Sequence, residues 1–92
     1  MRKMREMLIG SSAASTEEMK TITCEYYILV RELEEGIRGE SYGIRIKLLE
    51  EDASIEIPDI TSSAARVEAL AELLQRNFVT PCTLREVLED WL

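Results

Sequence analysis

Apolar residues recur at every second position in three stretches of the chain, 21–30, 42–48 and 55–57. The first stretch is also rich in β-branched and aromatic residues, and both features are typical of β-strands. The segments 34–40 and 50–52 separate the stretches, and their glycines or acidic residues are typical of turns. Pro58 has no amide hydrogen to donate to a neighbouring strand, so we expect the third strand to end there.

The alternation places apolar and charged side chains on opposite faces of the predicted sheet. One face collects Ile22, Tyr26, Ile28, Ile44, Ile46, Ile55 and Ile57. The other face collects Glu25, Arg45, Lys47 and Glu56. Opposite charges on neighbouring strands of that face are able to pair. One apolar face and one charged face are typical of an antiparallel sheet that is covered on a single side.

Two helices are predicted after the strands. The first begins at Thr61 or Ser62, either of which can cap it, and ends near Asn77, which suits a left-handed helix end. The second begins at Thr83. Each has one apolar stripe, made of Val67, Leu70, Ala71, Leu74 and Phe78 in the first and of Leu84, Val87, Leu88 and Trp91 in the second. We therefore predict an α+β fold: a three-stranded antiparallel β-meander with two C-terminal helices packed on one face.

The N-terminal segment shows neither pattern. Residues 10–18 are small and polar, which is typical of a linker. Met1, Met4, Met7 and Leu8 fall at helical spacing, but the segment is too short to hold a helix alone. A membrane-surface or partner-binding helix is the alternative to a frayed end there. We predict a flexible N-terminal tail over residues 1–18 and a single α+β domain over residues 19–92.

The chain carries a net charge of −7. This balance opposes binding to nucleic-acid phosphates and to anionic membrane surfaces. No apolar run approaches the roughly 18 residues of a membrane span, and the run Met7–Ile9 is too short for a secretory signal. Cys24 and Cys82 are then expected to be reduced thiols. These observations predict a cytoplasmic protein that binds neither nucleic acid nor membrane.

Residues suited to catalysis or to holding a bound group are scarce. The chain has no histidine, which removes the commonest general base and the commonest zinc ligand. Cys82 is a candidate reactive thiol at the start of the second helix, although the sequence shows no base to accompany it. The acidic turn 50–52 together with Asp59 is a candidate cation site, but it lacks the spacing of a calcium loop. We expect no enzyme activity, no cofactor and no metal site.

Four apolar side chains interrupt the charged face: Tyr27, Leu29, Leu33 and Leu49. Either the fold tolerates these apolar side chains on the charged face without a function for them, or they form a surface that binds a partner. A free edge of the sheet offers a further docking route, by strand addition. The leading hypothesis is a non-catalytic protein-interaction or regulatory module that binds a protein partner or itself, as a homodimer. The alternative is a sensor of a small ligand or divalent cation, which would use the acidic turn and the seam between sheet and helices.

Three blocks of the sequence also carry a resemblance. They are Tyr42-Gly43-Ile44, Asp59-Ile60-Thr61 and Asn77-x-Val79-Thr80-Pro81-x-x-Leu84-x-x-Val87-x-x-Asp90-x-Leu92. In these blocks residues 20–92 resemble a family of short uncharacterised proteins of clostridia-like Gram-positive bacteria, classed as a domain of unknown function. Thr83 stands where many members of that family have a histidine, so a histidine-dependent role does not carry over. The resemblance implies a bacterial cytoplasmic protein and no particular activity.

Overall fold

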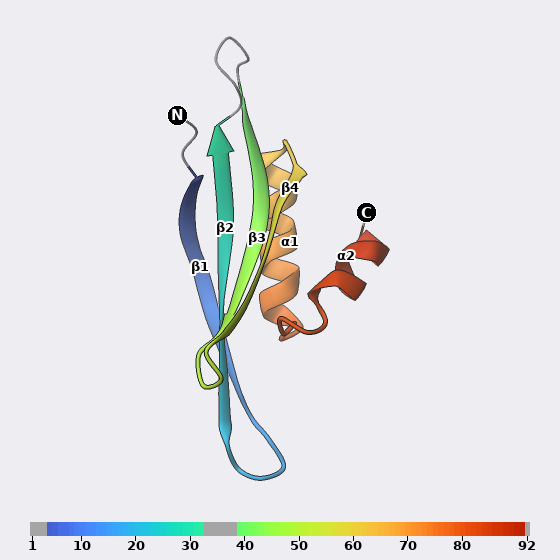
Figure 1. Cartoon of the computed structure of the whole chain (residues 1–92). Coiled ribbons are helices and arrows are strands. Elements are labelled where there is room, and N and C mark those ends of the chain that lie inside the picture. The colour runs from blue at the N-terminus through green and yellow to red at the C-terminus, as the bar shows by residue number, and fades with distance from the viewer. Residues whose placement is uncertain (1–3, 33–38, 92) are drawn as a thin grey trace.

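The computed structural model describes residues 4–32 and 39–91. Within these ranges the elements are β1 (Met4–Ser15), β2 (Thr21–Glu32), β3 (Glu40–Leu48), β4 (Ala53–Thr61), α1 (Ala64–Arg76) and α2 (Leu84–Trp91). The strands pair in chain order as an antiparallel meander. α1 runs along one face of the sheet and α2 follows beside it (Figure 1). The α+β class, the antiparallel sheet and the two C-terminal helices are thus confirmed.

The sheet has four strands, so the predicted three-stranded sheet is wrong in strand number. The additional strand, β1, lies within residues 1–18, which we predicted from the sequence to be a flexible tail. β1 pairs with β2 from Met4, opposite Arg31, to Ser15, opposite Thr21. This pairing, rather than a period of two in its own sequence, makes the segment a strand. A bulge between Leu8 and Gly10 further disturbs the alternation.

The core lies between α1 and the face of the sheet that it covers, which we call the core face. Tyr26, Ile28, Ile44 and Ile46 on this face are at most 1% exposed, as predicted. α1 contributes Val67, Leu70, Ala71 and Leu74, and α2 contributes Leu84 and Leu88. The Tyr26 hydroxyl donates a hydrogen bond of 2.8 Å to the carbonyl oxygen of Val79, which joins the sheet to the connection between the helices. Burial raises the pKa of Tyr26.

The ends of α1 differ in detail from the prediction. Its N-cap is Ser63, whose Oγ accepts a hydrogen bond of 3.2 Å from the amide of Arg66. At its C-terminal end the left-handed residue is Phe78, with a φ of 50°, rather than Asn77, with a φ of −95°. The side chain of Asn77 instead donates to the carbonyl oxygen of Leu73, at 3.0 Å, so it caps the helix by a hydrogen bond.

β4 continues through Pro58, where the sequence predicts an end. The strand can include this proline because β4 is an edge strand, and its register with β3 slips between the pairs Tyr42–Thr61 and Ile44–Ile57. The backbone of β4 approaches Gly43 closely at this irregularity. A Cβ atom on Gly43 would lie 2.3 Å from the carbonyl oxygen of Ile57 and 2.6 Å from Cα of Pro58. Glycine is therefore required by close packing of the backbone at this position.

No helix in residues 4–32 and 39–91 is both long enough and apolar enough to cross a lipid bilayer.

Candidate functional site

Of the predicted partner residues the structure describes Tyr27, Leu29 and Leu49, and these three do not share one exposed surface. Tyr27 and Leu29 lie on the face of β2 opposite to the core, which we call the outer face. Leu29 is only 1% exposed, so it is not accessible to a partner. Leu49 is 42% exposed in the turn after β3, where its amide bonds to Thr23. Leu33 lies outside the described residues.

Charged side chains cross-link the outer face. Arg45 of β3 forms ion pairs with Glu6 of β1 and with Glu56 of β4, the latter at 3.5 Å between Nε and Oε1. The pairing of Arg45 with Glu56 confirms that opposite charges meet across neighbouring strands. The guanidinium also lies 5.9 Å from the ring centroid of Tyr27. The Tyr27 hydroxyl donates to Glu25, which raises the pKa of Tyr27. The hydroxyl group and the ring of Tyr27 therefore already contact Glu25 and Arg45 of the same chain.

The predicted cation ligands do not form a cluster. The acidic turn 50–52 precedes β4, whereas Asp59 lies near its other end and forms an ion pair with Arg31 of β2. Glu50 accepts a hydrogen bond of 2.6 Å from the amide of Thr23. Among the described residues, no three or more His, Cys, Asp and Glu side chains lie close enough together to hold a metal ion. Glu50 thus connects the turn to β2, and Asp59 connects β4 to β2.

Glu50 gives the fold a pH dependence that can be measured. The hydrogen bond from Thr23 lowers the pKa of the Glu50 carboxyl below its ordinary value, so the ionised form is favoured in the folded state. The resulting stability is present above the pKa of the unfolded chain and is lost as the pH falls through the lower, folded pKa. We expect Glu50→Gln to lose less thermal stability than the wild type between about pH 5 and pH 3.

Thermal unfolding followed by circular dichroism over this pH range tests the expectation, with Glu51→Gln as the matched control. Glu51→Gln should follow the wild type in its pH dependence. Identical pH dependence of the wild type and Glu50→Gln would show that the bond to Thr23 contributes nothing.

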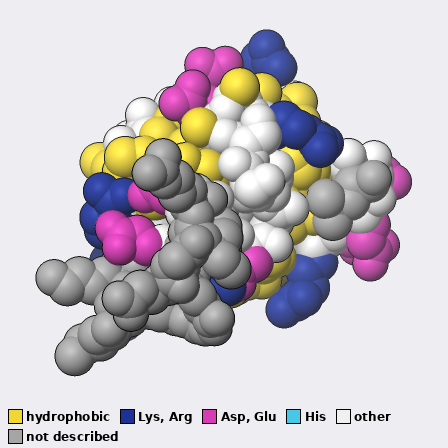
Figure 2. Space-filling model, turned by 90° about the horizontal axis from the view of Figure 1, so that it is seen from above, with side chains coloured by type: hydrophobic (Ala, Val, Ile, Leu, Met, Phe, Trp, Pro, Cys, Tyr) yellow, Lys and Arg dark blue, Asp and Glu magenta, His cyan; other side chains and the backbone are white. Residues whose placement is uncertain are grey.

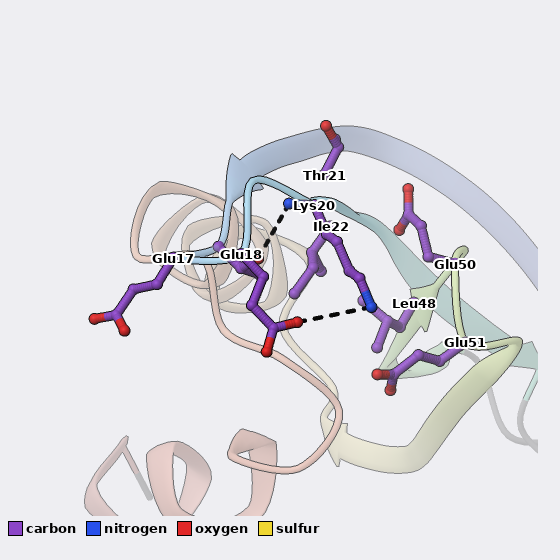
Figure 3. A pocket seen from close by; sticks show the side chains of 9 residues that line it. Glu17, Glu18, Lys20, Thr21, Ile22, Leu48, Glu50 and Glu51 are labelled. Carbon is purple, nitrogen blue, oxygen red and sulfur yellow. Dashed lines mark hydrogen bonds and ion pairs between the residues drawn. The ribbon is translucent and has the colours of Figure 1, made fainter.

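A surface pocket of about 800 Å³ lies where the β1–β2 turn meets the end of β3. Figure 3 shows its lining residues, which are Thr16, Glu17, Glu18, Lys20, Thr21, Ile22, Leu48, Glu50 and Glu51. Ile22 and Leu48 supply apolar surface, and Lys20 Nζ lies 3.7 Å from Glu18, while Glu17 points away. The alternative function, a sensor of a small ligand or divalent cation, was placed at the acidic turn and the seam between sheet and helices. Glu50 and Glu51 of that turn line this pocket, and the alternative stays a prediction.

The two cysteines have opposite environments. Cys24 is buried in the core face of β2, and burial raises the pKa of its thiol. Cys82, the candidate reactive thiol, is exposed just before α2. Neither thiol is paired in a disulfide in the structure.

Among residues 4–32 and 39–91, the largest group of exposed apolar side chains lies on β1. Met4, Met7, Leu8 and Ile9 are 38–56% exposed, and we call them the β1 edge surface. Met4 and Leu8 pair with outer-face residues of β2, and Met7 pairs with the core-face residue Ile28. The sequence analysis missed this surface. One feature of the sequence does point to it: residues 7–16 are the longest run without a charged side chain in this acidic chain.

α1 is attached to β1 through Gln75. Its side-chain Nε2 donates to the carbonyl oxygen of Ser11 at 3.2 Å, and its own carbonyl oxygen accepts from the Ser12 hydroxyl at 3.0 Å. Glu72 and Arg76, one turn apart on α1, line a hollow of about 420 Å³ with Ser12 and Gln75. The exposed charges of α1 therefore lie beside the outer edge of β1.

The fold and the exposed edge define a class of small α+β domain: a four-stranded antiparallel meander covered by helices on one face, with β1 as an accessible edge strand. The family model described as "Family of unknown function (DUF6514)" matches residues 5–92, and the chain belongs to this family. The match includes nearly all of β1, so it extends beyond the expected residues 20–92. No curated protein and no solved structure matches the chain.

Proposed function

We propose that this protein is a non-catalytic interaction module of the bacterial cytoplasm, which binds a protein partner by strand addition to β1. The observation that carries the proposal is the free edge of β1. β1 is twelve residues long, and among the described strands it pairs only with β2. Unpaired amide and carbonyl groups along such an edge are a template for another strand. The β1 edge surface adds apolar area on which a partner can pack.

The other edge of the sheet is less suited to strand addition. β4 contains Pro58, which has no amide hydrogen, and its register with β3 is irregular at the same place. Arg31 and Asp59 form an ion pair between β2 and β4 in this region. Proline and bulges are features by which proteins protect edge strands from pairing, and β1 has a bulge but no proline. A docking strand is therefore better accepted by β1.

The charge of the chain supports a protein partner rather than a nucleic acid. Its net charge is −7, and basic side chains are interspersed with acidic and apolar ones in the view of Figure 2. The absence of histidine from the whole sequence supports a non-catalytic role. The proposed cytoplasmic location is supported by the resemblance to bacterial proteins and by the free thiols of Cys24 and Cys82.

A tagged pull-down with two matched variants tests the proposal. Ser11→Lys places a charge in the uncharged part of β1, whereas Ser54→Lys makes the same change on β4, and both serines are exposed. We expect the wild type and Ser54→Lys to capture a stoichiometric partner, either another protein or an untagged copy of the chain. We expect Ser11→Lys to lose most of this capture while keeping the thermal stability of the folded chain. Equal capture by all three proteins, or capture by none, would contradict the proposal.

A further inference from the structure

We infer that the strand added to β1 is β1 of a second copy of this chain. The inference rests on the proposed function, because it names the partner of the same edge. Two copies related by a two-fold axis perpendicular to the sheet would pair their β1 strands antiparallel. The result is one continuous sheet of eight strands, in which the core faces and the two α1 helices lie on the same side. In Figure 1, β1 forms the free border of the sheet, away from β4.

The charge distribution along β1 fits a second copy. Two acidic chains repel each other, yet residues 7–16 carry no charge. An axis near Ser11 sets Ser12 against Gly10 of the second copy and, because the strand is bulged at Ile9, Met7 against Ala14, so the centre of the interface contains no like charges. Arg5, beside this uncharged segment, is ion-paired with Glu40 of its own chain, so its charge is balanced within each copy. The interface is thus self-complementary.

The position of α1 supports the same axis. Gln75 donates to the carbonyl oxygen of Ser11 and accepts from the Ser12 hydroxyl, so the middle of this uncharged segment lies beside the C-terminal half of α1. The Ser11 carbonyl oxygen has a second lone pair that can accept from an added strand. The exposed residues Glu72 and Arg76 lie on either side of this point and line the hollow beside Ser12. Rotation by 180° about the axis brings Glu72 of one copy towards Arg76 of the other, twice in the dimer. Opposite charges then meet across the seam between the helices.

A charge exchange on α1 tests this arrangement. Multi-angle light scattering and sedimentation of the full chain should show a dimer that dissociates on dilution. Glu72→Arg and Arg76→Glu should each raise the dimer Kd about tenfold, because each places like charges across the seam. The double variant Glu72→Arg/Arg76→Glu restores opposite charges and should return Kd towards the wild-type value. Ser11→Lys should give a monomer, and Ser54→Lys should not.

The outcomes separate this inference from the proposed function. A wild-type chain that is monomeric at all concentrations overturns the inference, and so does a dimer that Ser11→Lys leaves intact. The proposed function survives either result if a different protein is captured by the wild type and lost with Ser11→Lys. A dimer that is weakened by both single charge reversals and restored by their combination supports the inference, since a general loss of stability would not be reversed by the second change.

Discussion

Replacing Gly43 by alanine is expected to destabilise the fold by about 3 kcal/mol, since overpacking of a tight site costs this much. The added methyl group would lie 2.3 Å from the carbonyl oxygen of Ile57 and 2.6 Å from Cα of Pro58. Both are backbone atoms, so the strain can be relieved only by moving β4 away from β3. For a domain of this size the loss corresponds to a decrease in Tm of more than about 10 °C. Chemical denaturation with urea measures the change in the free energy of unfolding.

Gly10→Ala is the matched control. A methyl group at Gly10 also meets atoms at less than 3 Å, but they belong to the end of the Gln75 side chain. This side chain can rotate away, at the cost of its hydrogen bond to Ser11. We expect Gly10→Ala to cost about 1 kcal/mol, clearly less than Gly43→Ala. Equal effects of the two changes would mean that β4 does not lie as close to Gly43 as the structure places it.

Removing the side chain of Tyr26 is expected to have a similarly large effect. Tyr26→Ala should cost about 3–5 kcal/mol, because it leaves a cavity between the central strand β2 and α1. Tyr26→Phe keeps the ring and removes only the hydroxyl group, which leaves the Val79 carbonyl oxygen without its 2.8 Å hydrogen bond. We expect Tyr26→Phe to cost about 1–3 kcal/mol. The difference between the two variants separates packing by the ring from the bond to the helix connection.

Tyr42→Phe provides the comparison, because it removes a hydroxyl that makes a weaker contact of 3.3 Å with Glu40 in a part-buried position. Its effect on urea unfolding should be much smaller than that of Tyr26→Phe. If Tyr26→Phe unfolds at the same urea concentration as the wild type, the hydrogen bond to Val79 does not hold the helix connection against the sheet.

The strands with a clear period of two were predictable because burial of one face selects apolar residues at alternate positions. β2 and β3 are correct for this reason. The stripe of α1 is correct from Val67 to Leu74 because burial of one helix face selects apolar residues three or four positions apart, whereas Phe78 lies beyond the helix end. The predicted strand was shorter than β4 because we expected Pro58 to end it. Proline is excluded from the interior of a sheet, but Pro58 lies on an edge strand. The acidic turn was correctly interpreted as a turn, and its Glu50 bonds to Thr23 rather than to a cation.

β1 could not be predicted from its own residues. An edge strand buries little, so its sequence is under weak selection for alternation, and most of β1 is exposed. The evidence for it lies in β2, whose long apolar sequence, including the buried Leu29 on the outer face, indicates a central strand. Leu29 was therefore correctly identified as unusual for a charged face, and of the two interpretations left open for it, its burial excludes the partner surface. A search for the second neighbour of β2 would have led to β1 and to the candidate interface.

Because Cys24 is buried and Cys82 is exposed, thiol labelling can measure how often the native fold opens. A thiol reagent added to the native protein reaches Cys82 directly, whereas Cys24 is shielded until β2 separates from the helices. Because the chain has only these two cysteines, intact mass distinguishes one adduct from two. The rate at which the second adduct appears then reports how often the central strand opens under native conditions, without denaturant or an added probe. If this rate is measured at several protein concentrations, a decrease with concentration would show that self-association protects β2 from opening.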